Sequence, residues 1–397
     1  MRIAVLLPEF PPDAIGGGGV VFQALVNEYA ARHQVRVFTA ADSTRSWIRG
    51  RFRGAELRIS VNRYPLIPVG KGVAYLRSSM PMNLRGWLDL RHDITSWNPE
   101  VAHVHGYGHL FVDLGVRLLM AQRIPYVFTC HGIPTRPFRQ NVMARTTFRI
   151  YQRIAASNSV LNAQVVTAVS KSAAAALIHR NPIQIIPNGL SALPSSDLRK
   201  ADLLRTKLGL SASVSVVAAA GRLSIEKGFD VLVNALDQVR VEQVACVIAG
   251  SDAGEGARLA RLAEKCRPGV SVLFPGRLDS RGIADLFAIA DVVVVPSREE
   301  SFGLVALEAL AAEKRLVATN AGGLGDFLDP HLAHLVSRDN ARELSDAISG
   351  CLELGPVTEE ERKQFQTFVA QFSWSAIAQR YEVLLSAVAS KHRSNGD

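Results

Sequence analysis

We predict from the sequence an α/β protein made of two doubly wound domains. Short runs of apolar and β-branched residues alternate with longer helical stretches along the whole chain. The runs are continuously apolar, as in parallel sheets that are covered by helices on both faces. A chain of 397 residues also exceeds the length that one hydrophobic core ordinarily serves.

The candidate strands form two groups. In the first half of the chain they are Ile3–Leu7, Val35–Thr39, Val101–His105, Tyr126–Cys130, Val165–Val169 and Gln184–Ile186. In the second half they are Val214–Ala219, Val244–Ala249, Val270–Phe274, Val292–Val295 and Leu316–Thr319. The polar segment 191–202 is the predicted linker, so we expect an N-terminal domain over residues 1–190 and a C-terminal domain over residues 205–369.

A helix expected over 372–388 carries a single apolar stripe, which must pack on one of the two domains. The stripe consists of Trp374, Ile377, Tyr381, Leu384 and Val388. The pattern itself fits either domain. We hypothesise that segment 370–397 crosses back to the N-terminal domain.

Composition excludes several classes of protein. Hydrophobic residues make up 48% of the chain and charged residues 20%, which excludes general disorder. There is no uninterrupted apolar stretch of about 18 residues, so we expect no membrane span. The first ten residues suit a buried strand better than a signal peptide. The four cysteines lack CxxC spacing and indicate free thiols in a cytoplasmic protein.

The positive charge lies mainly in the first half of the chain. Residues 1–180 hold 22 Lys and Arg against 9 Asp and Glu, a net +13, and residues 181–397 hold 23 against 27, a net −4, which together give the overall +9. The basic runs are 45–63 and 136–153. The second run fits an amphipathic helix on anionic lipid or a solvated helix packed on its own domain. Nucleic-acid binding is not expected, because no recognised motif or aromatic platform accompanies the charge.

In open parallel sheets the ligand lies beyond the carboxyl ends of the strands. After the first strand, Gly16–Gly19 lead into a helix, where backbone amides can approach a phosphate, although a merely flexible loop fits equally well. Four histidines lie in or after later strands, namely His103, His105, His109 and His131, and two of them alternate on one strand face. No carboxylate cluster accompanies them, so we expect no metal site and favour His131 as a hydrogen-bonding group for a polar ligand.

In the second half, Arg222 and Lys227 stand between Gly221 and Gly228 at a helix entrance. Two cations and helix amides form an efficient diphosphate clamp, although both side chains also suit an ordinary surface. The loops 249–256 and 274–280 are able to offer backbone edges to a nucleobase. Their candidate residues are Gly250, Arg277 and Leu278.

The segment EESFGLVALEALAA, residues 299–312, contains one carboxylate in an otherwise apolar helix. A buried, unpaired Glu308 costs several kcal/mol unless it protonates or meets a partner. Glu300 lies eight residues earlier, about 12 Å along a helix, so the two are better placed to hold the ends of one long ligand than to share a proton. Alternatively, Glu300 interacts only with the helix dipole and Glu308 with a buried arginine.

These motifs together resemble glycosyltransferase family 4, the retaining, sugar-nucleotide-dependent enzymes of the GT-B fold. The resemblance covers nearly the full chain, through PP…GGGG, HG at 131–132, AVSKS at 168–172, IPNG at 186–189, GRLSIEKG at 221–228, PSREESFGLVALEAL, GG at 322–323 and the FSW…Y helix. It implies two Rossmann-like domains that face each other across a cleft.

The resemblance also implies residue roles. Arg222 and Lys227 match the positions that hold the donor diphosphate and stabilise the leaving nucleotide. Glu308 matches the glutamate that binds the ribose hydroxyls, and Glu300 matches the one beside the transferred sugar. The remaining matches are His131 near the sugar, Gly16 and Gly17 over the diphosphate, and the backbone of Phe302, Gly303 and Leu304 facing the sugar and phosphate. The family needs no bound metal or other cofactor.

Some residues depart from the family pattern. Glu313 and Arg315 stand where relatives usually carry Gly and Pro, which puts the local turn in doubt. Asp326 replaces a glutamate, and AGSDAGEG replaces the commoner GDGP loop, so the base of the donor is not predicted.

The expected function is transfer of a hexose-type sugar from a UDP- or GDP-sugar to an acceptor in envelope polysaccharide or glycolipid synthesis. The basic first half suggests an anionic or lipid-linked acceptor and peripheral contact with the inner face of a membrane. Alternatives are a soluble acceptor in a secondary-metabolite or thiol pathway, and a non-catalytic nucleotide-sugar-binding protein. GGGGV lacks the G-x-G-x-x-G spacing of a dinucleotide-dependent dehydrogenase. No oligomeric state is predicted.

Overall fold

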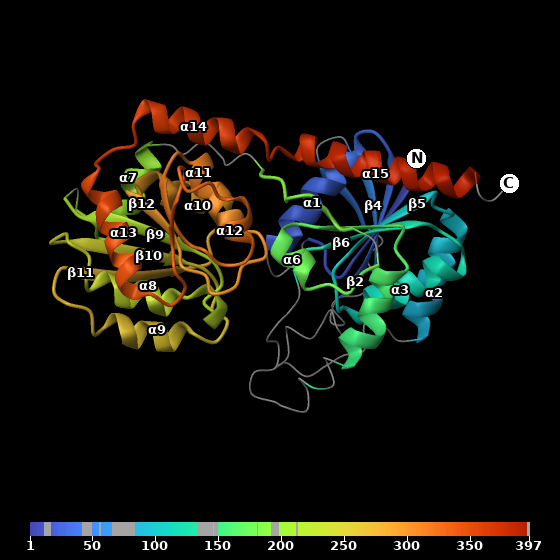
Figure 1. Ribbon diagram of the computed structural model, residues 1–397, viewed down its shortest axis with the longest axis horizontal. Helices are drawn as coiled ribbons and strands as arrows, with labels where there is room; N and C mark the ends of the chain where they lie inside the picture. Colours follow the sequence, from blue (N-terminus) through green and yellow to red (C-terminus); the bar gives the residue numbers. More distant parts are fainter. Residues whose placement is uncertain are drawn as a thin grey trace. The chain divides into compact units, whose positions relative to one another are not determined.

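The computed structural model describes residues 1–11, 17–41, 50–54, 57–65, 84–132, 146, 150–180, 182–191, 198–211 and 213–394 (Figure 1). The chain divides into two compact units. Unit 1 combines Met1–Gly189 with Trp374–Asp397, and unit 2 is Leu190–Ser373.

Unit 1 is built on an eight-stranded sheet with the order β3-β4-β2-β1-β5-β6-β7-β8. All neighbours are parallel except β3 and β4. The strands are β1 (Arg2–Leu7), β2 (Gln34–Ala41), β3 (Gly50–Gly54), β4 (Leu57–Pro65), β5 (Val101–His105), β6 (Tyr126–Cys130), β7 (Val165–Ala168) and β8 (Gln184–Ile185). Every strand predicted in this half is present within two residues of its expected ends.

The sequence analysis missed β3 and β4, which lie in the basic run 45–63. In β4 the buried residues Ile59, Val61 and Tyr64 are interspersed with polar ones. Such a strand lacks the continuous apolar run that marks a central parallel strand. Strands near the edge of a sheet are therefore harder to recognise by composition.

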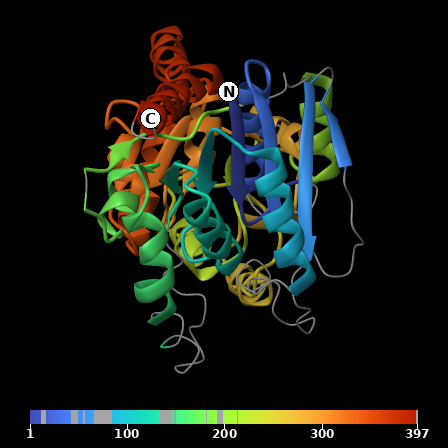
Figure 2. The same ribbon diagram turned by 90° about the vertical axis from the view of Figure 1, so that its right-hand side faces the viewer.

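The helices of unit 1 are α1 (Gly17–Ala30), α2 (Leu84–Trp97), α3 (Leu110–Ala121), a π-helical turn η2 (Gln152–Ala156), α5 (Ser157–Leu161), α6 (Lys171–Ala175) and α15 (Trp374–Ser394). α3 packs against α2, η2 and α5, which lie side by side in Figure 2. Most of the predicted amphipathic helix at 136–153 lies outside the described residues.

The prediction that the C-terminal helix returns to the N-terminal domain is confirmed. α15 packs on α1, β5 and β6 and buries Trp374, Ile377, Tyr381 and Val388. Leu385 is also buried in place of the expected Leu384. Among the described residues no helix is both long and apolar enough to cross a bilayer.

Unit 2 contains a six-stranded parallel sheet with the order β11-β10-β9-β12-β13-β14. The strands are β9 (Ser215–Ala220), β10 (Val244–Ala249), β11 (Val270–Gly276), β12 (Val292–Val295), β13 (Arg315–Thr319) and β14 (His334–Val336). β14 was not predicted, because three residues with an exposed histidine give no apolar run. The order of the strands reverses between β9 and β12, which makes that point a topological switch.

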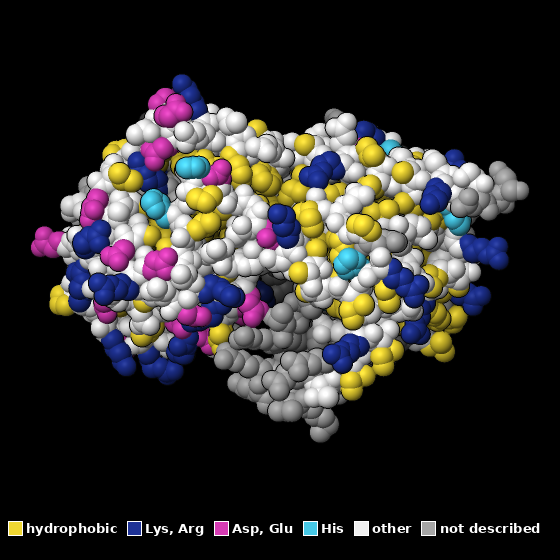
Figure 3. Space-filling model, viewed as in Figure 1, with side chains coloured by type: hydrophobic (Ala, Val, Ile, Leu, Met, Phe, Trp, Pro, Cys, Tyr) yellow, Lys and Arg dark blue, Asp and Glu magenta, His cyan; other side chains and the backbone are white. Residues whose placement is uncertain are grey.

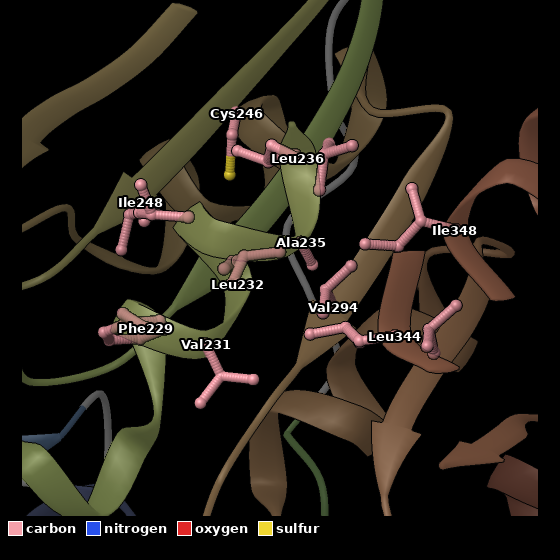
Figure 4. Close-up of a cluster of buried hydrophobic side chains, with 14 of the residues drawn as sticks. Phe229, Val231, Leu232, Ala235, Leu236, Cys246, Ile248, Val294, Leu344 and Ile348 are labelled. Atoms are coloured by element: carbon pink, nitrogen blue, oxygen red, sulfur yellow. The ribbon is translucent and has the colours of Figure 1, made fainter. Parts of the chain in front are cut away.

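The helices of unit 2 are α7 (Leu198–Lys207), a 3₁₀ turn η3 (Ile225–Lys227), α8 (Phe229–Leu236), α9 (Gly256–Ala263), α10 (Ser280–Ile289), α11 (Leu304–Ala311), α12 (Gly323–Phe327), α13 (Ala341–Glu353) and α14 (Glu359–Ala370). One of its core clusters joins α8, α13 and the sheet through Leu232, Ile248, Val294 and Leu344 (Figure 4). This packing fixes the start of α8 relative to the strands.

The predicted linker 191–202 is wrong at its C-terminal end, where α7 begins at Leu198. Leucine, alanine, lysine and arginine dominate this segment and are strong helix formers. α7 packs on α10, and Leu204 and Leu208 contact the core. Part of the predicted linker therefore belongs to a packed helix.

The turn after α11 accommodates Glu313 and Arg315, the two residues that replace the Gly and Pro usual in the family. Glu313 has φ +55°, the left-handed conformation that a glycine ordinarily takes at this position. Arg315 is 6% exposed and donates to both carboxylate oxygens of Glu361, at 2.9 Å each. Its guanidinium also donates to the carbonyls of Gly355 and Pro356. The arginine thus fastens the start of β13 to α14.

We expect Arg315→Met to destabilise the protein by about 2–4 kcal/mol, because the buried guanidinium is the donor to two carbonyls and to the carboxylate of Glu361. Arg240→Met is the matched control, because Arg240 bonds to Asp346 and Glu353 at 2.9 and 3.0 Å but is 51% exposed. Urea denaturation should show a large shift in midpoint for the first variant and little shift for the second. Equal shifts would contradict the assigned role of Arg315.

Candidate functional site

The candidate site of unit 2 lies at the carboxyl ends of β9 and β12, where the strand order reverses. The loops that follow these strands touch through Gly228, whose φ is +65°. A Cβ at Gly228 would lie 2.1 Å from the carbonyl oxygen of Pro296. Only glycine therefore allows the loop that carries Arg222 and Lys227 to approach the loop that carries Glu300.

Arg298 clamps these two loops together. Its guanidinium donates to both carboxylate oxygens of Asp230 at 2.8 and 2.9 Å and to the carbonyl of Ile225 at 2.8 Å. Its backbone amide donates to the carbonyl of Glu226 at 2.8 Å. Burial raises the pKa of Asp230, but hydrogen bonds from Arg298 and Arg258 outweigh it and hold the pKa below its ordinary value.

The sequence analysis missed Arg298 and Asp230. The available signals were an arginine two residues before the predicted ligand-binding Glu300 and an aspartate in the first turn of α8. Neither pattern identifies its partner without the fold, because the two residues are far apart in the chain.

The clamp brings two of the predicted residues into contact. Lys227 Nζ lies 2.5 Å from Glu300 Oε2, and both side chains are largely buried, at 20% and 16% exposed. Ser297 Oγ also donates to Glu300 Oε2, at 3.4 Å. Arg222 lies in the same loop, with its guanidinium 3.5 Å from Glu226 and 38% exposed. One partly buried ion pair and one more accessible cation therefore occupy the switch point.

The loops after β9, β10 and β11 continue the pairing of their strands. The amide of Gly221 donates to Ala249 O and that of Gly250 to Gly276 O, both at 2.9 Å. A Cβ at Gly250 would lie 1.7 Å from Gly221 O, so this approach requires glycine. Gly250 is thereby held next to the loop of Arg222, while Arg277, which is exposed, and Leu278, which is partly buried, follow β11.

A glycine-rich loop supports the start of α11. Gly303 precedes the helix with φ +103°, and the amide of Gly323 donates to Glu300 O at 2.7 Å. The ring of Phe302 is buried and stacks on Phe327, with ring centroids 4.6 Å apart. Phe302 can therefore offer a ligand only its backbone, beside the first amides of α11, at Leu304 and Val305, which have no partner within the helix.

Glu308 lies on α11 between the buried residues Leu307 and Ala309. Its side chain retains some exposure, yet burial raises the pKa of its carboxyl group to about 7. No residue in the described part of the chain donates a hydrogen bond to this carboxylate or pairs with it. The hypothesis of a buried arginine partner is therefore wrong for the described residues.

In unit 1, His105 and His131 lie at the ends of adjacent strands. His105 Nδ1 and His131 Nε2 are 2.9 Å apart, and the ring of Phe22 lies 5.1 Å from that of His131. Burial lowers the pKa of His131 to about 4, against an opposing hydrogen bond to Asn188. His131 is therefore neutral near pH 7 and able to hydrogen-bond an uncharged ligand group.

The other histidines do not assemble a metal site. His103 bonds to Tyr29 and Thr129, at 3.0 and 2.7 Å, inside the sheet–helix interface. Within the described ranges no group of three or more His, Cys, Asp or Glu side chains is arranged to hold a metal ion. Of the predicted glycines, Gly17 is the first residue of α1, and Gly16 lies outside the described residues.

Comparison with known proteins identifies the family of the chain. Residues 15–192 match the model described as Glycosyltransferase Family 4, and residues 201–371 match that of Glycosyl transferases group 1. D-inositol 3-phosphate glycosyltransferase of Corynebacterium jeikeium is 30% identical over 295 residues, which cover 70% of each chain. Lipopolysaccharide 1,2-N-acetylglucosaminetransferase of Salmonella typhimurium is 31% identical over 215 residues, which cover 50% of this chain and 55% of the relative.

Solved structures share the fold over 98% of this chain and 100% of theirs. Sucrose-phosphate synthase from Thermosynechococcus elongatus superposes with a TM-score of 0.74 at 23% identity, and HepE from Anabaena, in complex with UDP-glucose, with 0.74 at 22%. The two Rossmann-like sheets, the matching models and these relatives agree, and the chain therefore belongs to glycosyltransferase family 4, with the GT-B fold.

Proposed function

We propose that the protein is a retaining, metal-independent hexosyltransferase whose donor is a UDP- or GDP-sugar bound by unit 2. The observation that carries this proposal is the cluster at the switch point, where Arg222, Lys227 and Glu300 lie at the carboxyl edge. The unpartnered Glu308 adds a second polar group on the same helix that begins beside Glu300. HepE, which was solved with UDP-glucose, supports a uridine donor among the candidates.

In this proposal the donor diphosphate lies between the cations and the start of α11. Lys227 is neutralised by Glu300 in the donor-free protein, and a phosphate oxygen takes the place of that carboxylate when the donor binds. Arg222 and the backbone amides of Gly303 and Leu304 add further positive charge. Preorganised cations then stabilise the leaving diphosphate, as a metal ion does in other enzymes.

During transfer, the bond between the anomeric carbon and the phosphate oxygen breaks and its electrons stay with the diphosphate. The acceptor hydroxyl forms the new bond on the same face, and its proton passes to the departing phosphate oxygen. This geometry retains the anomeric configuration. Glu300, once released from Lys227, contacts the transferred sugar, and neutral His131 and the loop of Gly16 and Gly17 in unit 1 contribute from the acceptor domain.

Glu308 accepts hydrogen bonds from the ribose hydroxyls of the donor. A carboxylate with a pKa of about 7 is costly in the empty protein, and two hydroxyl donors offset this cost when the nucleotide binds. Glu300 precedes α11 and Glu308 lies within it, so the two carboxylates are available to different parts of one donor. Gly250, Arg277 and Leu278 are proposed to contact the base.

We propose an anionic or lipid-linked acceptor, in envelope polysaccharide or glycolipid synthesis at the cytoplasmic face of a membrane. The net +13 of residues 1–180 and the name of the Salmonella relative support this class. The Corynebacterium relative, named for D-inositol 3-phosphate, supports a soluble anionic acceptor as the second candidate. A non-catalytic binding protein is disfavoured, because the chain retains Arg222, Lys227, Glu300 and Glu308 together, and loss of catalysis should remove such charged residues first.

The function is tested by incubating the protein with a panel of UDP- and GDP-sugars and measuring thermal stabilisation and nucleotide release. We expect one base to give stabilisation and slow release by hydrolysis, at the same rate with EDTA. No response to any donor contradicts the proposed function, and complete loss of release with EDTA contradicts metal independence.

Arg222→Ala and Lys227→Ala should each lower kcat by about a hundredfold or more, because each removes charge from the leaving group. Arg240→Ala, which removes an exposed arginine outside the site, should leave kcat unchanged. The measurement is steady-state nucleotide release by each variant and by the control, with the donor that the panel identifies. A change confined to KM would show that the cations only bind the donor.

Glu308→Gln should weaken donor binding by about tenfold or more and should also stabilise the empty protein at pH 8. A folded pKa of about 7, above the ordinary value of 4.5, means that folding binds protons between these values. The stability of the wild type therefore falls as pH rises through this window, by up to about 3 kcal/mol, and glutamine removes this cost.

The measurement is urea denaturation of wild type and variant at pH 5 and pH 8, with calorimetric titration of the donor. Glu264→Gln, an exposed carboxylate on unit 2, is the control and should change neither quantity. Unchanged donor affinity in Glu308→Gln would exclude the ribose contact. A stability difference independent of pH would exclude the buried charge as its cause.

A further inference from the structure

In the described part of unit 1, four of the exposed large apolar side chains form two pairs, whereas Met120, Ile178 and Val383 are exposed singly. Leu84 and Leu88, near the start of α2, are 74% and 52% exposed. Ile150 and Ile154 are 54% and 70% exposed, among the described helical residues 150–161, which include η2 and α5. Single exposed apolar residues are common, but paired residues one helical turn apart form a stripe.

The two stripes point outward from the same layer of helices. α2 buries Gly86, Leu90 and Ile94, and Leu84 and Leu88 lie on its opposite side. α3 packs against α2 and against η2 and α5, so both stripes belong to one layer on one side of the sheet (Figure 2).

The stripes also lie toward one particular edge of the sheet. α2 ends just before β5 begins, and α5 ends just before β7 begins. The ends of both helical segments therefore lie at the amino edge, and the described residues farthest from these ends, which carry both stripes, lie toward the carboxyl edge. His105 and His131 follow their strands at that same edge of unit 1.

The exposed charges around the stripes are basic. Arg85, Arg91, Arg117 and Arg153 are exposed on α2, α3 and η2. Of the two acids on α2, Asp89 is partly buried, and Asp93 is turned inward, where it accepts hydrogen bonds from Asn62 and Tyr64 at 2.7 and 2.8 Å. In Figure 3, hydrophobic and basic side chains share the surface over these helices, and no acidic side chain is visible among them.

We propose that this face, defined by Leu84, Leu88, Ile150 and Ile154 with the four arginines, docks on an anionic lipid bilayer. Separate apolar pairs between arginines do not form the continuous patch of a protein interface. They suit a headgroup region, where leucine and isoleucine enter the acyl boundary and arginines meet lipid phosphates. The proposal rests on the proposed function, because docking here brings the carboxyl edge of unit 1 close to a lipid-linked acceptor.

The test is flotation of the full chain with vesicles of phosphatidylcholine alone or with phosphatidylglycerol added. We expect binding to the anionic vesicles that weakens with salt. Leu84→Gln/Leu88→Gln and Ile150→Gln/Ile154→Gln should each lower the partition coefficient by about tenfold or more. Leu203→Gln/Leu354→Gln is the control, because it removes two apolar residues of unit 2 that are 51% and 62% exposed and should not change binding.

Absence of binding to anionic vesicles, or equal loss in the control, overturns the proposal. A dimer in sedimentation experiments that the four substitutions dissociate would assign the face to a second copy of the chain and also overturn it. Nucleotide release from the donor in solution separates this proposal from the proposed function. The surface variants should retain that activity, whereas a chain that binds vesicles and responds to no donor would refute the proposed function alone.

Discussion

The contact on which the candidate site depends is the clamp between Arg298 and Asp230. A bidentate ion pair, a bond to the carbonyl of Ile225 and a backbone bond to Glu226 tie the end of β12 to the start of α8. The clamp acts across the switch point of the sheet, where no crossover connects the two strand ends directly. Planar, always-charged guanidinium is suited to this task, because a single side chain fixes both distance and orientation. The ion pair of Lys227 and Glu300 follows from this geometry.

The site contains one carboxylate that is paired with a cation and one that is not. Lys227 and Glu300 neutralise each other at 2.5 Å, whereas Glu308 has no partner among the described residues and its pKa is raised by burial to about 7. In the proposed function both arrangements are changed by the donor, whose diphosphate takes the place of Glu300 beside Lys227 and whose ribose hydroxyls donate to Glu308. Charged groups with perturbed pKa values occur more often at functional sites than elsewhere in proteins.

Much of the fold was predictable because its central strands are buried on both faces and so consist of continuous apolar runs. β4 and β14 escaped recognition because each lies near a sheet edge and mixes polar with apolar residues, and α7 because its charged residues looked like a linker. The candidate site was predictable where a residue type is unusual for its position, as with Glu308 in an apolar helix. Arg298 and Asp230 carry no such signal, because charged residues near helix starts are ordinary.

The sequence by itself determined the two doubly wound domains, the family resemblance and the positions of the charged residues at the strand ends. These properties depend on local composition and on order along the chain, which can be read without coordinates. Only the tertiary structure decided which charges meet: that Lys227 pairs with Glu300, that Arg298 joins the loops and that Glu308 meets no arginine in the described residues. Pairing depends on the parallel register of β9 and β12 and on the close approach at Gly228, and these are properties of packing between distant segments.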